Sequence, residues 1–422
     1  MRVTGYLHTI STVLLLCAAG HAGEVLIPMD QTQSDHLKAY GVAFWGLEQG
    51  ARVDWLLNYR GGSFLCEEAP GLREACMVRG VTYESIDAAR AAGIRAAIEQ
   101  ENMEVIRLEK IPKVAIYTPP TKEPWDDAVT LALAYAEIPY ETVWDTDVMG
   151  GRLYDYDWLH LHHEDFTGQF GKFYAAYRDA LWYRQEKQAS EELARALGFT
   201  KVSHLKRSVS LAIRDYVEQG GYLFAMCSAP ETVDIALSAH RTDIVPTEFD
   251  GDPPDPDCQK HLDYTMCFAF TGFTVSLDPI AYEHSDLDTS PDRMMRVSDR
   301  GADFFTLFEF SAKLDPVPTM LVQNHVNAVN GFMGQTTAFR KTLVKNRVTI
   351  LAESPALGEV RYLHGNFGRG TFTFYGGHDP EDYQHMVGDP PTDLEFHKNS
   401  PGYRLILNNI LFPAARKKER KT

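Results

Sequence analysis

Basic side chains are under-represented in this sequence. Its 422 residues include 41 Lys and Arg against 58 Asp and Glu, giving a formal net charge of -17. Binding to a nucleic-acid backbone requires Lys and Arg to displace phosphate counterions, so this balance argues against nucleic acid as a partner. The one basic cluster, at residues 414–422, is expected to be a solvated tail.

Long apolar runs are missing as well, except at the N terminus. There Arg2, the run VLLLCAA and the small residues Gly20 and Ala22 together predict a secretory signal peptide cleaved near Ala22. We therefore expect export to the periplasm or the extracellular space. A buried N-terminal helix is disfavoured because a charged, turn-rich segment follows, and Cys17 is a weak lipoprotein signal because Leu16 precedes it. No other run approaches the roughly 20 apolar residues of a membrane span, so no membrane span is expected.

Cysteines are few, and export would leave five of the six. Cys66 and Cys76 are neighbours in one segment and Cys258 and Cys267 in another, so two local disulfides would leave Cys227 alone. The alternative is that all five are buried thiols. An unpaired Cys227 in an exported protein suggests a specific role.

Two common ligand-binding motifs are absent. The glycine loop at 58–65 lacks the lysine pattern of a phosphate-binding loop and is expected to be a turn. The aspartates at 250, 252, 255 and 257 lack EF-hand spacing because prolines interrupt them, so a solvated loop is favoured over a calcium site.

Strands alternating with helices dominate the sequence from residue 111, which predicts a doubly wound, mostly parallel α/β sheet. The segment at 25–53 resembles the one at 114–142, so a related N-terminal α/β unit that extends the same sheet is expected. The predicted organisation is a signal peptide at 1–22, an N-terminal α/β segment at 24–110, a core in two parts at 111–241 and 345–413, an insertion at 242–344 and a tail at 414–422.

The stretch GGYLFAMCSAPETVDIAL at 220–237 places a thiol where catalysis would need one. YLFAM predicts a buried strand and Ala229–Ser238 a helix, so Cys227 falls at the carboxyl end of a parallel strand. Free N–H groups at such a turn lower a thiol pKa and can hold an oxyanion near Ser228. The alternative is that Cys227 is a small hydrophobe in the core.

A base for this thiol is expected from FYGGHDPED. His378 follows another predicted strand, and Asp379 and Glu381 beside it could orient the imidazole. The predicted catalytic set is therefore Cys227, His378, Asp379 and Glu381.

These residues resemble the class I glutamine amidotransferase-like superfamily. IRDYVEQGGYLFAMC is similar to the helix and strand that lead to its cysteine elbow, and His378, Pro380 and Glu381 resemble its His-Pro-Glu motif with Asp379 inserted. The resemblance spans about residues 112–240 and 345–413, and GRGTFTFYGGHDPED is closer still to the trehalose-utilisation branch. It implies a flavodoxin-like fold and amide or sugar chemistry.

The sequence departs from the superfamily's elbow pattern and from the asparagine synthetase motifs. The elbow pattern Gly-x-Cys-x-Gly-x-Gln is replaced by Ala225, Cys227, Ala229 and Glu231. Exported bacterial proteins of this appearance are sometimes labelled asparagine synthetase B, but the chain lacks a Cys directly after the initiator Met and the SGGxDS-type loop. An ATP-dependent asparagine synthetase is therefore disfavoured.

The segment LHLHHEDFTG at 159–168 supplies a second cluster. His160 and His162 share one strand face, His163 lies on the other, and Glu164 and Asp165 begin the following loop. His162, His163, Glu164 and Asp165 are candidate substrate-binding residues, and the first three could ligate a divalent metal. The alternatives are hydrogen-bonded structural histidines and a carboxylate that caps a helix. His325 could approach this cluster from the insertion.

Three hypotheses remain from the sequence. The first is an exported thiol hydrolase or amidase for a small polar amide or sugar-derived substrate. The second is a metal-assisted or non-catalytic sugar-processing protein that uses His162, His163, Glu164 and His378. The third is a binding protein that retains the fold without its chemistry. No firm cofactor and no oligomeric state follow from the sequence.

Overall fold

The structure is a computed structural model that describes residues 23–120, 127–292, 303–315, 323–354, 357–383 and 389–416. The predicted signal peptide and residues 417–422 of the predicted tail lie outside these ranges. Within them, no helix combines the length and the apolar character that crossing a bilayer requires.

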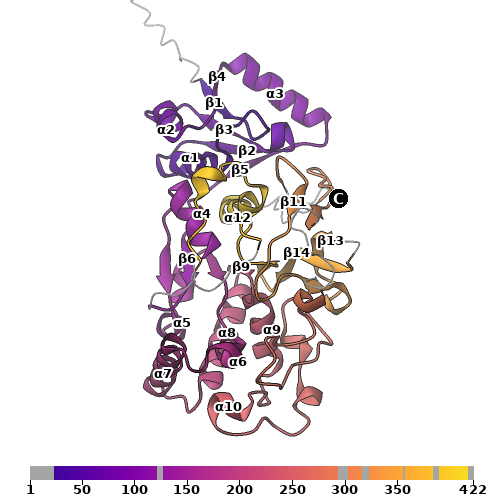
Figure 1. The fold of residues 1–422 in the computed structure, drawn as a ribbon. Coiled ribbons are helices and arrows are strands. Elements are labelled where there is room, and N and C mark those ends of the chain that lie inside the picture. Colours follow the sequence, from indigo (N-terminus) through magenta and orange to yellow (C-terminus); the bar gives the residue numbers. More distant parts are fainter. Residues whose placement is uncertain are drawn as a thin grey trace, which may run out of the picture.

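An antiparallel sheet forms the N-terminal unit (Figure 1). Its order is β4-β1-β3-β2-β5, and its strands are β1 (Glu24–Ile27), β2 (Val53–Leu57), β3 (Ser63–Glu67), β4 (Glu84–Ile86) and β5 (Glu104–Leu108). Helices α1 (His36–Glu48), α2 (Leu72–Arg79) and α3 (Ala88–Gln100) connect them. The expected strand–helix–strand unit is present in β1, α1 and β2, but it builds a separate sheet, because β3 pairs antiparallel with both strands.

A larger, 10-stranded sheet forms the second unit, and half of it is parallel. Each neighbouring pair in the order β7-β6-β8-β9-β15 is parallel. These strands are β6 (Val114–Tyr117), β7 (Glu141–Val143), β8 (Trp158–Leu161), β9 (Tyr222–Met226) and β15 (Gly370–Tyr375). Their carboxyl ends therefore meet at one edge.

The other half of this sheet is antiparallel, which corrects the expectation of a mostly parallel sheet. It consists of β10 (Phe304–Leu307), β11 (Ala328–Asn330), β12 (Phe339–Arg340), β13 (Thr349–Ser354) and β14 (Glu359–Phe367). The change of direction occurs where Gly368 and Arg369 join β14 to β15 in a tight hairpin, since a connection this short permits only antiparallel pairing. The insertion contributes β10, β11 and β12 to the sheet edge.

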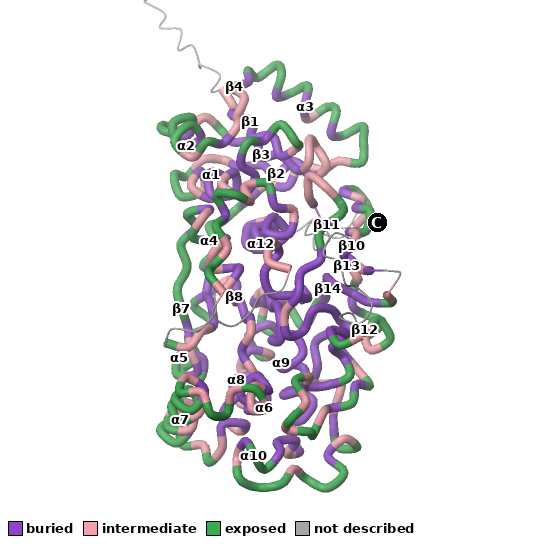
Figure 2. The backbone as a smooth tube through the Cα atoms, viewed as in Figure 1, coloured by how far each residue is buried: buried purple, intermediate pink, exposed green. Residues whose placement is uncertain are grey.

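Helices separate and cover the two sheets (Figure 1). Helices α1, α4 (Ala128–Ala136) and α12 (Pro401–Leu411) share one apolar core with both sheets. The opposite face of the large sheet packs against α8 (Val202–Glu218) and α9 (Ala229–Ser238), and α7 (Leu181–Ala196) lies outside α8. The short helices are α5 (Asp145–Met149), α6 (Tyr174–Tyr177) and α10 (Thr247–Asp250). Figure 2 shows the buried backbone concentrated in the strands, α9 and α12.

The bounds predicted around Cys227 are confirmed, since β9 and α9 have the expected limits. Helix α8 begins at Val202, and Lys201 takes the cap position without a side-chain hydrogen bond. Ser203, in the first turn of this helix, is buried.

Arg404 connects α12 to the N-terminal unit. Its fully buried guanidinium donates to the Tyr40 hydroxyl at 2.9 Å, to the Met29 carbonyl at 3.1 Å and to the Gly61 carbonyl. His325 Nδ1 lies 3.1 Å from the same group, and its ring stacks on His36 at 4.0 Å. His325 therefore lies at the junction of the two units, not at the cluster near residue 162 that it was expected to approach.

Replacing this guanidinium should destabilise the junction. We expect Arg404→Ala to lower the free energy of unfolding by about 3 kcal/mol, because several buried acceptors lose their donors together. Urea denaturation followed by circular dichroism would measure the change. The exposed Arg178 offers a control, and equal stability of Arg404→Ala and Arg178→Ala would contradict the expectation.

Candidate functional site

Cys227 occupies a strained elbow between β9 and α9. Its φ of 52° lies in the left-handed region, where a non-glycine residue costs energy and is often found at functional turns. Its sulfur accepts backbone N–H groups from Ser228, Gln335 and Thr336. The last two belong to the insertion, so the insertion closes over the thiol.

This environment keeps the thiol protonated. Cys227 is 2 % exposed, and burial raises the pKa of its thiol to about 11, although the backbone donors oppose the rise. The nearby Asp288 carboxyl adds to the increase. A strand-to-helix turn was expected to lower this pKa, but desolvation outweighs the backbone donors.

All five described cysteines after the predicted cleavage site are free and buried. The structure therefore matches the alternative of buried thiols, not the two local disulfides. Burial also raises the pKa of Cys76 to about 12.

His378 follows β15 and lies beside both the thiol and the other histidines. A methyl group built on Gly334 would meet His378 Cβ at 3.0 Å and Cys227 Sγ at 3.2 Å, so these residues border the same small space. The His378 ring packs against His162 at 4.4 Å between centroids and is stacked with His163 at 5.9 Å.

The carboxylates next to His378 make contacts elsewhere. Asp379 accepts the Tyr403 hydroxyl at 2.7 Å and the Glu381 N–H at 2.8 Å. Glu381 pairs with His397 at 3.2 Å. These contacts brace the loop after β15, so the expected orientation of the imidazole by Asp379 and Glu381 does not follow from them.

Three imidazoles meet at the carboxyl edge of the parallel strands. His162, His163 and His378 each offer a nitrogen, and these nitrogens all lie within 4.8 Å of one another. His162 and His163 were expected on opposite strand faces, but β8 ends at Leu161, so strand alternation does not apply to them. Such a group can hold a metal ion.

Asp127 is a member of the site that the sequence reasoning missed. Its carboxylate lies 3.2 Å from His160 Nε2 and 3.6 Å from His162 Nδ1, and it caps α4 by accepting the N–H groups of Val129 and Thr130. Burial opposes ionisation, but the two imidazoles hold the pKa of this carboxyl well below its usual range. The signal was an aspartate immediately before the helix that follows the first parallel strand in the chain.

His160 extends this group into the core. It is fully buried, with Nδ1 at 3.2 Å from the Phe224 carbonyl and Nε2 at 3.3 Å from His162 Nδ1. His160 therefore supports His162 from behind, as the structural alternative for this residue predicted.

Glu164 and Asp165 have different roles in the loop after β8. Glu164 accepts the His162 N–H at 3.0 Å, and the residue is 7 % exposed. Asp165 accepts N–H groups from Thr167, Gln169 and Gly171. Asp165 thus organises the loop, although it also borders the adjacent cavity.

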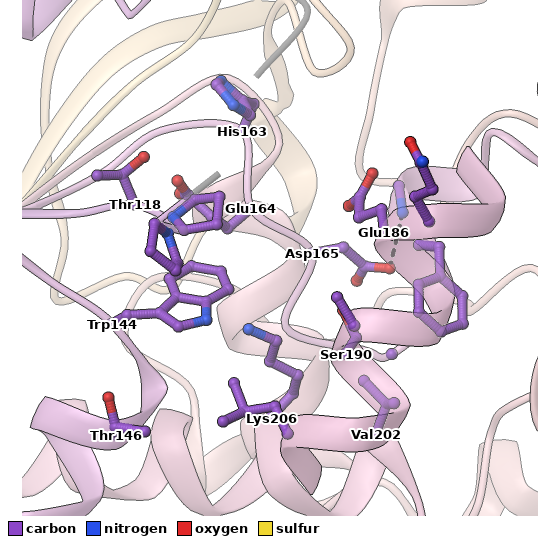
Figure 3. A pocket seen from close by; sticks show the side chains of 18 of the residues that line it. Thr118, Trp144, Thr146, His163, Glu164, Asp165, Glu186, Ser190, Val202 and Lys206 are labelled. Carbon is purple, nitrogen blue, oxygen red and sulfur yellow. Dashed lines mark hydrogen bonds between the residues drawn. The ribbon is translucent and has the colours of Figure 1, made fainter. Parts of the chain in front are cut away.

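A cavity of about 730 Å³ opens beside His163. It lies at the carboxyl ends of β6, β7 and β8, where the chain order of the strands reverses, which is the usual ligand position in open α/β sheets. Figure 3 shows His163 above Glu164, with Trp144 and Lys206 below them and Glu186 across the cavity. Cys227 and Ser228 are not among the residues that line it.

A group of three aspartates elsewhere in the fold, Asp243, Asp250 and Asp252, already contains a cation. Lys201 Nζ lies 2.7 Å from Asp243, 3.1 Å from Asp250 and 2.6 Å from Asp252. Its ammonium provides the positive charge that these carboxylates require, so this group is a salt-bridge network.

No known protein family and no curated protein matches this sequence. Similar solved structures include two described as cytoplasmic proteins, one from Salmonella typhimurium and one from its LT2 strain. They show 11% and 9% identity with TM-scores of 0.33 and 0.34, and each match covers 72% of this chain and 100% of the other. At these values the similarity supports no statement about fold or function.

The buried thiol should react slowly in the folded protein. With a pKa near 11, only about a thousandth of Cys227 is thiolate at pH 8, so we expect iodoacetamide to leave it largely unmodified while the protein is folded. Mass spectrometry of the peptide would follow the reaction, with urea-unfolded protein as the control. Rapid alkylation of the folded protein at pH 7 would contradict this expectation.

Proposed function

We propose that this protein is a metal-assisted hydrolase that acts on a small polar substrate, with His162, His163 and His378 as the metal ligands. The observation that carries the proposal is the convergence, beside a cavity, of three imidazoles from the segments that follow β8 and β15. His163 belongs to both the imidazole group and the cavity wall.

The geometry of the imidazoles fits a divalent ion such as Zn²⁺. Metal–nitrogen bonds of about 2.1 Å in a tetrahedron place the nitrogens roughly 3.4 Å apart. The three nitrogens lie within 4.8 Å, so modest ring rotations bring them to that separation. Three protein ligands leave a position for water, whose pKa a bound metal lowers so that it can act as a nucleophile.

Asp127 is a positioning residue in this proposal. It faces Nδ1 of His162, which favours the tautomer with the proton on Nδ1 and directs the Nε2 lone pair to the other side of the ring. A carboxylate behind a metal-binding histidine is a recurrent arrangement that raises the basicity of the ligand.

Glu164 is the candidate acid–base residue. Its carboxylate borders the cavity next to His163 and is held in place through the His162 N–H. A carboxylate there can take a proton from an attacking water and return it to the leaving group.

The amidotransferase-like superfamily remains the proposed relationship of the fold. In chain order the parallel strands are arranged 2-1-3-4-5, the flavodoxin-like order, which supports it. The strained elbow at Cys227 supports it as well. Export after cleavage near Ala22 stays a prediction, because those residues lie outside the described ranges.

A second candidate function is thiol hydrolysis by Cys227 with His378. It is favoured by the positive φ of Cys227 and the backbone N–H groups around its sulfur, both common at nucleophile turns. Screening a panel of chromogenic amides and esters separates the two. Activity lost with a chelator, restored by Zn²⁺ and retained in Cys227→Ser supports the metal mechanism, whereas the reverse pattern supports the thiol.

The metal assignment can also be tested without a substrate. We expect the full chain to bind one equivalent of Zn²⁺, measured by mass spectrometry of the metal after dialysis. His163→Ala and His378→Ala should each weaken binding by more than about 100-fold, because each removes a direct ligand. His204→Ala, on α8 and away from the cluster, is the matched control. Equal metal content in all these proteins would overturn the assignment.

Replacing Asp127 should weaken Zn²⁺ binding less than replacing a direct ligand does. Asp127→Asn should weaken Zn²⁺ binding by about 10- to 100-fold, because the carboxylate behind His162 is lost. The α4 cap should survive, since Asn is also a favourable N-cap residue. Competition with a fluorescent chelator would measure the affinity, and circular dichroism would check the helix content. Unchanged affinity would assign Asp127 to capping alone.

A further inference from the structure

The cavity beside His163 is lined by more acidic than basic side chains. Its carboxylates are Asp147, Glu164, Asp165 and Glu186, and its only ammonium among the described residues is Lys206. A surplus of negative charge in a concave site attracts cations and repels anions.

Lys206 does not offset this surplus, because its charge is already neutralised. Its Nζ lies 2.9 Å from Asp145 Oδ2 and donates to the Tyr117 hydroxyl at 2.9 Å. The same ammonium lies 4.0 Å above the Trp144 ring. An anionic ligand would have to compete with Asp145 for it.

Apart from Glu164, the proposed acid–base residue, Glu186 is the cavity carboxylate available to a ligand. Asp147 pairs with Arg152 at 2.7 Å, and Asp165 is occupied by backbone N–H groups. Glu186 projects from α7 across the cavity from Glu164 and has no hydrogen-bond or ion-pair partner within the described ranges (Figure 3).

Aromatic rings form much of the remaining wall. They are Trp144, Phe170, Phe173 and Trp182. Aromatic faces attract organic ammonium groups through their quadrupoles, and Lys206 above Trp144 is an example within this cavity.

We propose that the cavity binds a small organic cation with an ammonium group held between Glu186 and the aromatic wall, and that this cation is part of the substrate. The substrate identity rests on the proposed hydrolase function. Binding of the cation to the cavity does not require the metal, so the two ideas can fail separately.

The proposed contact makes binding depend on pH. Glu186 is exposed to the cavity, yet desolvation by the surrounding protein raises the pKa of its carboxyl to about 7; Asp165 adds to the rise and Lys206 opposes it. Glu186 is therefore neutral below that pH and anionic above it, so affinity for a permanent cation should increase from pH 6 to pH 8. Tyr183 of α7, together with Glu164 and His163 from the β8 side, also faces this region.

Calorimetry on the full chain, treated with a chelator, tests the proposal. The probes are choline, its neutral carbon isostere dimethylbutanol, glucose and acetate. We expect choline to bind roughly tenfold more tightly than the isostere, and acetate not to bind. Glu186→Gln should reduce choline affinity about tenfold at pH 8 and remove most of its pH dependence. Glu192→Gln, exposed on the same helix outside the cavity, is the control.

Each outcome decides one of the two ideas. Equal binding of choline and its isostere, tighter binding of glucose or acetate, or an unchanged pH profile in Glu186→Gln would overturn the cation site. Choline binding by a protein that takes up no Zn²⁺ would retain the cation site and overturn the metal mechanism.

Discussion

The parallel pairing of β8, β9 and β15 is the constraint on which the site depends. Because these strands are neighbours with the same direction, their carboxyl ends meet, and the residues that follow them converge. His162 and His163 are thereby brought against His378, although more than 200 residues separate them in the chain. The antiparallel hairpin of β14 and β15 fixes the last of these strands in place.

Burial affects the protonation state of each group at this edge differently. The Cys227 thiol loses acidity because its charged form is poorly solvated, even though backbone N–H groups surround the sulfur. Asp127 stays ionised in the same environment because two imidazoles and the start of α4 compensate its charge. Imidazoles do not need to carry a charge to bind a metal, so burial hinders a histidine site less than a thiolate.

The N-terminal unit contributes stability to this arrangement without lining the cavity. It shares an apolar core with α4 and α12, and Arg404 adds directional hydrogen bonds across the junction. Since Asp127 is the N-cap of α4, packing of the N-terminal unit on α4 also supports the carboxylate behind His162. The histidine cluster and the junction are therefore linked through α4.

The sequence by itself determined the local elements. Apolar runs and helical spacing located β9 and α9, and the position of Cys227 and His378 after strands placed both at one edge. The histidine cluster at 160–163 was also visible, because the residues of a strand and the loop after it are adjacent in the chain. The prediction of a mostly parallel sheet was wrong for half of the strands, because periodicity does not reveal the direction of a strand. The short hairpin between β14 and β15 reverses the strand direction.

Tertiary structure alone decided which groups act together. Contacts between residues distant in sequence place Asp127 against His160 and His162. Contacts of the same kind join Asp379 to Tyr403 and Glu381 to His397. They also stack His325 on His36 at the junction of the two units. The acidity of Cys227 depended on the insertion folding over it, and desolvation cannot be read from neighbouring residues. The cavity likewise exists because α7 and the ends of three strands meet in space, which no local pattern encodes.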